Sequence, residues 1–91
     1  MRYRTNKNFE LKEIAGELLL LPRGASTVDY NYVTVFNETG AFIYRNMSEY
    51  VDIETLSKLL AEKYNIDIEI AKADIEDYIK KMLESEIIEV E

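Results

Sequence analysis

The chain has 91 residues, enough for one domain with a modest core, and its 11 basic and 18 acidic residues give a net charge of −7. This charge repels a phosphate backbone, so neutral or basic proteins and peptides are the favoured partners, rather than nucleic acid. Histidine and cysteine are both absent, which excludes disulfides, ordinary zinc sites and the common nucleophile–base pairs. No carboxylate spacing matches a dedicated metal loop. We therefore expect no catalytic residue, no metal and no cofactor; a carboxylate pair in a cleft is the one acid–base alternative.

The apolar runs are too short for a membrane protein. Leu18–Leu21 spans only four residues, whereas a membrane-spanning helix needs about 20. The first six residues lack the apolar centre of a signal peptide. We expect a cytoplasmic protein with no membrane partner.

The N-terminal part predicts a β-hairpin preceded by a flexible arm at residues 1–8. Apolar and polar residues alternate over Phe9–Ile14, which is typical of a half-buried strand. Ala15-Gly16 supplies a tight turn, because glycine adopts positive φ without strain. The chain returns as a second strand over Glu17–Leu21, and Pro22 ends it because proline cannot donate to the ladder.

The next segment predicts a strand joined directly to a helix. A polar connection at residues 23–31 leads to a third strand, Tyr32–Phe36, which completes a small antiparallel sheet. Asn37 follows at once and is a good N-cap for a helix over residues 38–47. Glu38 in the first turn favours the helix dipole. The strand and the helix are therefore held at a fixed angle.

Two further helices follow with clear start signals. Asp52 and Asp67 are the predicted N-caps, and Asn65 is a plausible left-handed residue between the two helices. Residues 87–90 are apolar and can extend back against the core. The resulting fold class is α+β, a three-stranded antiparallel sheet followed by three helices with winged helix-turn-helix-like proportions, in one domain over residues 1–91. Two apolar stripes support the helices: Ile53, Leu56, Leu59, Leu60 and Tyr64, then Ala71, Ile75, Tyr78, Ile79 and Met82.

The chain resembles the PqqD family of small peptide-binding proteins, also called RiPP recognition elements. (RiPPs are ribosomally made, post-translationally modified peptides.) The resemblance covers roughly residues 9–90. In this family a Gly-Leu pair often follows helix three, where this chain has Glu86-Ile87, and Asp-Gly often precedes helix two, where it has Ser48-Glu49-Tyr50. The resemblance depends on Val33-Thr34-Val35-Phe36-Asn37-Glu38-Thr39-Gly40-Ala41, Leu59-Leu60-Ala61-Glu62-Lys63-Tyr64, Ile66-Asp67, Ala71, Asp74-Ile75 and Tyr78-Ile79.

The resemblance implies a function in peptide recognition without catalysis. Members bind the leader region of a precursor peptide and present its core to a modifying enzyme. The leader adds as an antiparallel strand beside the third strand and lies against helix three. The enzyme is a radical SAM enzyme in some systems and the leader peptidase and cyclase of lasso-peptide assembly in others; further members act in making pyrroloquinoline quinone.

These considerations give a set of candidate peptide-binding residues. The edge of the third strand would pair with the leader through its main chain. Val35, Ile75 and Met82 have core packing as an alternative to lining the groove, and Tyr78 can simply bury its ring. The strand contributes Tyr32, Val33, Thr34, Val35 and Phe36; helix three contributes Ile75, Tyr78 and Met82 to the lining, with Asp74 and Lys81 at the lip.

Two other functions are compatible with this layout. The first is a winged-helix DNA-binding regulator, although the third helix has more acidic than basic residues. The second is a dimerisation module that pairs its own open edge with a second copy, so we expect a monomer or a weak dimer.

Overall fold

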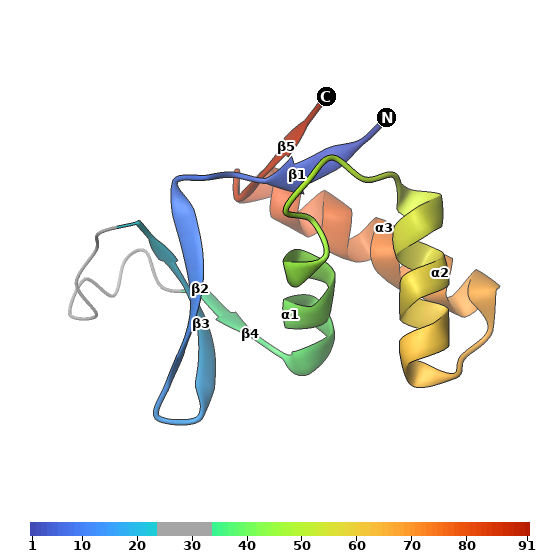
Figure 1. The fold of residues 1–91 in the computed structure, drawn as a ribbon, viewed down its shortest axis with the longest axis horizontal. Helices are drawn as coiled ribbons and strands as arrows, with labels where there is room; N and C mark the ends of the chain where they lie inside the picture. Colours follow the sequence, from blue (N-terminus) through green and yellow to red (C-terminus); the bar gives the residue numbers. More distant parts are fainter. Residues whose placement is uncertain (24–33) are drawn as a thin grey trace.

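The computed structural model describes residues 1–23 and 34–91, which form helices and antiparallel strands (Figure 1). The strands are β1 (Tyr3–Thr5), β2 (Phe9–Ile14), β3 (Glu17–Pro22), β4 (Thr34–Phe36) and β5 (Ile88–Val90). The helices are α1 (Glu38–Arg45), α2 (Ile53–Tyr64) and α3 (Ile68–Glu84). The α+β prediction is confirmed, with the predicted three helices, but the described strands form two sheets rather than one.

The first sheet contains the predicted hairpin and has the strand order β2-β3-β4. Its register pairs Phe9 with Pro22 at one end and Ile14 with Glu17 at the turn. The turn residues Ala15 and Gly16 have φ values of 53° and 82°, as a type I′ hairpin turn requires. β4 then pairs with β3 from Thr34↔Leu20 to Phe36↔Leu18.

All three helices begin at the predicted N-caps. The side chains of Asn37, Asp52 and Asp67 accept hydrogen bonds from the first-turn N–H groups of Gly40, Thr55 and Glu69. Asn65 ends α2 in the left-handed region, with φ 52° and ψ 51°, as expected for this residue type. α1 is shorter than predicted because the chain tightens after Arg45, where the N–H of Asn46 donates to the carbonyl of Ile43.

The expectation of a flexible arm at residues 1–8 is wrong. Tyr3–Thr5 form β1, which pairs with β5 at the other end of the chain (Figure 1). Tyr3 also exchanges two main-chain hydrogen bonds with Val51, of 2.8 and 2.9 Å, and its side chain is only 7% exposed. The reason is a non-local pairing, with more than 80 residues between its partners, that a local sequence pattern does not reveal.

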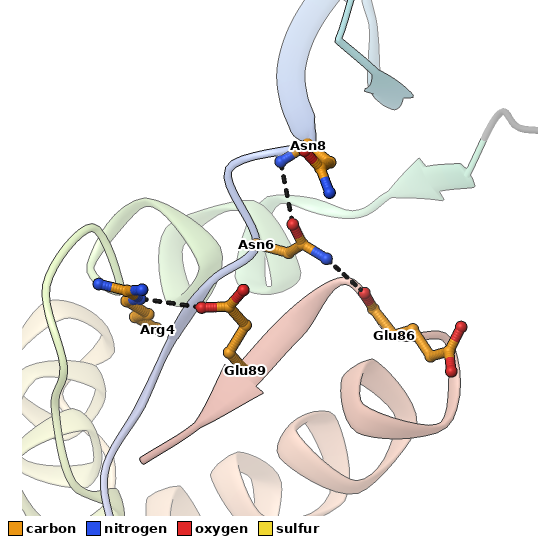
Figure 2. Close-up of polar contacts among 5 residues, drawn as sticks. All are labelled: Arg4, Asn6, Asn8, Glu86 and Glu89. Carbon is orange, nitrogen blue, oxygen red and sulfur yellow. Dashed lines mark hydrogen bonds and ion pairs between the residues drawn. The ribbon is translucent and has the colours of Figure 1, made fainter.

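Ion pairs and an asparagine hold the terminal sheet in place. Arg2 pairs with Glu91, and Arg4 donates to Glu89 over 3.0 Å. Asn6 lies where the chain leaves this sheet for the hairpin: its amide nitrogen donates to the carbonyl of Glu86, and its Oδ1 accepts from the N–H of Asn8 (Figure 2). The two sheets are therefore connected through a hydrogen-bonded corner.

The core lies between the helices and both sheets. Leu20 of β3, Tyr3 of β1 and Ile88 of β5 share one buried apolar cluster with the inner faces of the helices. Burying this much apolar surface is what stabilises so small a fold. The helical members of the cluster are Ile43, Tyr44, Leu56, Leu60, Ala71, Ile75, Ile79 and Met82.

Candidate functional site

The outer edge of β4 is the main-chain surface on which the predicted site was based. β4 lies at the end of the order β2-β3-β4, and β3 is the only strand paired with it among the described residues. An edge strand of this kind presents unpaired N–H and C=O groups that another chain can pair with. Thr34, Val35 and Phe36 belong to β4, whereas Tyr32 and Val33 lie outside the described residues.

Phe36 connects this edge to the core. Its half-buried ring meets the ring of Tyr44 on α1 edge-on, with a centroid separation of 5.6 Å. The Tyr44 hydroxyl is buried and has no hydrogen-bond partner among the described residues. Burial therefore raises the pKa of Tyr44, partly opposed by the positive charge of Arg23. The open strand thus rests on an aromatic pair that includes an unsatisfied polar group.

The junction between β4 and α1 is also tied to α3. Asn37 Oδ1 accepts from the N–H of Gly40 at 2.8 Å and from the hydroxyl of Tyr78 at 2.9 Å. A Cβ atom at Gly40 would lie 3.1 Å from Tyr78 Cε1 and 3.2 Å from Asn37 Oδ1. Glycine is therefore what allows the Tyr78 ring to approach the first turn of α1. We refer to Asn37, Gly40 and Tyr78 as the junction contact.

The remaining predicted residues of α3 divide between core and surface. Ile75 and Met82 are buried, with exposed fractions of 0% and 2%, so the core alternative describes their position. Asp74 and Lys81 are exposed. Lys81 donates to Asp77 at 3.0 Å, and this hydrogen bond raises the pKa of Lys81. The structure therefore brings Asp74, Tyr78 and Lys81 to one side of α3.

Sequence reasoning identified Tyr78 and Asn37 separately but missed the contact between them. The two residues are 41 positions apart, and no local pattern relates a helix cap to a distant tyrosine. Gly40 was the sequence signal that could have indicated this contact. Glycine lowers helix propensity, so a glycine in the first turn of a helix suggests that another group approaches it closely.

The exposed surface of α3 is acidic overall. α3 contains three lysines and five carboxylates, and Lys81 is already paired with Asp77. A recognition helix needs positive charge near phosphates, so this surface does not favour nucleic acid. The lysines are Lys72, Lys80 and Lys81, and the carboxylates are Glu69, Asp74, Glu76, Asp77 and Glu84.

Two surface hollows have none of the described candidate peptide-binding residues in their lining. One of about 570 Å³ is lined by β1 and by the N-terminal halves of α2 and α3. The other, of about 460 Å³, lies between the β2–β3 hairpin, α1 and the end of α2. Among the described residues, no group of three or more acidic side chains could hold a metal ion, and no helix there is long and apolar enough to cross a membrane.

Comparison with protein families places the chain in a described family. The family model described as coenzyme PQQ synthesis protein D (PqqD) matches residues 28–88, which is more than half of the chain. No curated protein sequence shows significant similarity.

Two solved structures have the same fold. One is the solution NMR structure of the PqqD truncation of Methylobacterium extorquens PqqCD, described as a functional, stand-alone RiPP recognition element. It is 13% identical, with a TM-score of 0.76 over 98% of this chain and 89% of that chain. The other is TbiB1 in complex with the TbiA(beta) leader peptide, 16% identical, with a TM-score of 0.74 over 97% and 96% of the two chains. At these identities the similarity shows the fold.

Proposed function

This chain belongs to the PqqD family, and from that premise we propose that it binds the leader segment of a ribosomally synthesised precursor peptide and presents the peptide to a modifying enzyme. The observation that carries the proposal is the outer edge of β4, which has no partner strand among the described residues. TbiB1, which has the same fold, is in complex with a leader peptide, and this supports the proposal.

The leader would bind by adding a strand to β4. Each main-chain hydrogen bond contributes about 0.5–1.5 kcal/mol, and the ordering of a flexible peptide opposes binding by about 2–5 kcal/mol. Main-chain pairing alone therefore leaves little net affinity, and buried apolar anchors, which contribute about 1.5–3 kcal/mol each, would have to supply the rest. Strand addition with such anchors thus requires no preformed deep pocket.

Selectivity would come from side chains, because main-chain pairing is nearly independent of sequence. On the α3 side these are Tyr78, with Asp74 and Lys81 as the charged neighbours. Ile75 and Met82 would support this side of α3 from the core rather than contact the leader, since both are buried.

The partner enzyme would supply the chemistry. We propose that the chain has no catalytic role of its own and that a radical SAM enzyme, or a leader peptidase and cyclase, acts on the bound precursor. The chain would increase the local concentration of the peptide at that enzyme, and this effect requires no catalytic group.

The test is isothermal titration of the chain with synthetic leaders made from the short reading frames that sequencing identifies around its gene. Alternate residues of an antiparallel strand point their N–H groups to opposite edges. A leader N-methylated at a single position should therefore lose affinity by about tenfold, the effect of one hydrogen bond, when the position is one of every second residue that pairs with β4. N-methylation at the positions between should leave the affinity unchanged.

Proline variants give the corresponding test on the protein. Thr34→Pro and Val35→Pro remove N–H groups that point to opposite edges of β4. Only the variant that removes the outward-pointing N–H should lose leader binding and still keep the circular dichroism spectrum of the folded protein. Affinities that do not alternate with N-methyl position would contradict strand addition, whereas no binding of any leader would contradict the proposed function itself.

A further inference from the structure

The hollow formed by α2, α3 and β1 has the properties of a second binding surface. Its volume is about 570 Å³. Ile68 on α3 is 43% exposed there, and the neighbouring side chain of Ile53 is half-buried. We call it the α2–α3 cleft; its lining residues are Met1, Tyr3, Asp52, Ile53, Glu54, Ser57, Lys58, Ile68, Glu69, Lys72 and Glu76.

The floor of the cleft can accept an apolar side chain. Ser57 is 1% exposed and is the only buried polar residue in the described part of the chain. Its hydroxyl donates to the carbonyl of Ile53 at 2.7 Å, so it needs no partner from a ligand. An apolar group entering the cleft would remove Ile68 and Ile53 from water without competing for the hydroxyl of Ser57.

The rim of the cleft carries a small excess of negative charge. Four carboxylates line it against two lysines and the N-terminal amino group of Met1, whose charge acts on Asp52, and none of the six side chains takes part in an ion pair among the described side chains. Asp52 is already used as the cap of α2, since it accepts from the N–H of Thr55 at 2.7 Å. Glu54, Glu69 and Glu76 remain for a basic partner, which the net charge of −7 also attracts at long range.

The cleft and the proposed leader-binding side occupy different sides of α3. Ile68, Lys72 and Glu76 follow each other at spacings of four residues, whereas Asp74, Tyr78 and Lys81 lie about 150° away around the helix at about 100° per residue. Tyr78 faces the junction between β4 and α1, and Ile68 faces α2. Both sides can therefore be occupied at the same time.

We propose that the α2–α3 cleft docks the modifying enzyme, through a segment of that enzyme with an apolar side chain flanked by lysine or arginine. This inference depends on the proposed function and names the surface that the second partner would use. The leader on one side of α3 and the enzyme on the other would bring substrate and catalyst together without competing for a surface.

The experiment measures two affinities of each variant by biolayer interferometry. One probe is the synthetic leader, and the other is the purified radical SAM enzyme, or leader peptidase and cyclase, from the same biosynthetic system. Ile68→Gln and Glu76→Lys remove the apolar contact and reverse one rim charge. Ile68→Gln should weaken enzyme binding by about tenfold or more, as expected for a central interface residue. Glu76→Lys should weaken it by roughly threefold or more, mainly through a slower association rate, as expected for a rim charge. Both should leave leader affinity within about twofold.

Matched controls lie on the same helix outside the cleft. Ile70→Gln changes an even more exposed isoleucine, at 57%, and Glu84→Lys makes the same charge change near the end of α3. Both controls should bind the enzyme as the unchanged protein does. Added salt should weaken enzyme binding of the unchanged protein more than that of Glu76→Lys.

The outcomes separate this inference from the proposed function. Full enzyme binding by Ile68→Gln and Glu76→Lys, or equal losses in the controls, would overturn the docking site even if the leader binds. A change in sedimentation of the cleft variants alone, with unchanged enzyme binding, would assign the cleft to a second copy of the chain and would also overturn it. Failure of the leader to bind the unchanged protein would instead count against the proposed function.

Discussion

β1 and β4 are both three-residue strands, but their surroundings differ. β1 lies between β5 on one edge and Val51 on the other, and the ion pairs Arg2–Glu91 and Arg4–Glu89 join the two ends of the chain. β4 has β3 on one edge and no strand on the other among the described residues. The difference indicates that strand length does not distinguish the two strands, whereas an unpaired row of main-chain groups, to which another chain could add, does.

The neighbours of the two strands differ in the same way. β1 brings the buried ring of Tyr3 into the core cluster, so its pairing is part of global stability. β4 is followed directly by Asn37, whose side chain satisfies the start of α1 and the hydroxyl of Tyr78. The junction contact orients the strand while leaving its outer edge available. We therefore expect damage to β1 to lower stability and damage at β4 to lower binding.

The largest effect should follow from Tyr3→Ala. It removes an aromatic side chain that is only 7% exposed, and such truncations cost about 3 kcal/mol or more in the free energy of unfolding. Urea denaturation followed by circular dichroism measures this loss, with Lys7→Ala in the exposed connection as the control. Leader affinity of the folded variant should stay within about twofold; a large loss of affinity would mean that the two sheets are coupled.

A smaller effect should separate the junction contact from an ordinary helix cap. Asn37 accepts hydrogen bonds from two donors, whereas Asp67 accepts one first-turn N–H, that of Glu69, at 2.8 Å. Asn37→Ala should therefore cost about 2 kcal/mol in unfolding free energy and Asp67→Ala about 1 kcal/mol.

The excess cost of Asn37→Ala should disappear when Tyr78→Phe is already present, since the hydroxyl is then absent from both proteins compared. A double-mutant cycle by urea denaturation measures this coupling. Equal costs for the two caps, or no coupling to Tyr78, would show that the junction contact adds nothing to the cap.

The local features of the fold were predictable because their causes lie within a few residues. The three N-caps Asn37, Asp52 and Asp67 and the left-handed Asn65 were all predicted and observed. The pairing of β1 with β5 was not predicted, because Tyr3 and Val90 meet only once the whole chain has folded. Short polar and apolar tripeptides at the two ends carry no periodic signal that specifies each other.

The candidate site was predictable in its strand and less so on its helix. The edge position of β4 follows from a hairpin plus one further strand, which the turn and breaker residues indicate. Helical periodicity alone could not decide whether Ile75 and Met82 line a groove or fill the core, because both alternatives need the same spacing. In the structure both side chains are buried in the core. The role of these residues in leader binding stays a prediction for titration to test.

The smallest expected effect concerns the aromatic pair beneath the open strand. Tyr44 supports Phe36 of β4, but its hydroxyl is buried with no partner in the described part of the chain. Tyr44→Phe keeps the ring and removes this group, so the free energy of unfolding should rise, by about 1 kcal/mol or less. Tyr78→Phe, which removes a bonded hydroxyl, should instead lower it by a similar amount.

The alkaline pH dependence of stability provides the check on Tyr44. Burial raises its pKa in the folded state above the usual 10.0. Below that value the hydroxyl is protonated in both the folded and the unfolded chain, so Tyr44 makes stability no more dependent on pH. As the pH rises from there toward the folded pKa, only the unfolded chain ionises, and the free energy of unfolding falls. The advantage of Tyr44→Phe over the unchanged protein should therefore widen between pH 9 and pH 11 (about one unit on each side of that value) in urea denaturation. A constant difference across this range would mean that the hydroxyl is solvated in the folded state, and Tyr44 would then support the edge strand without a loss of stability.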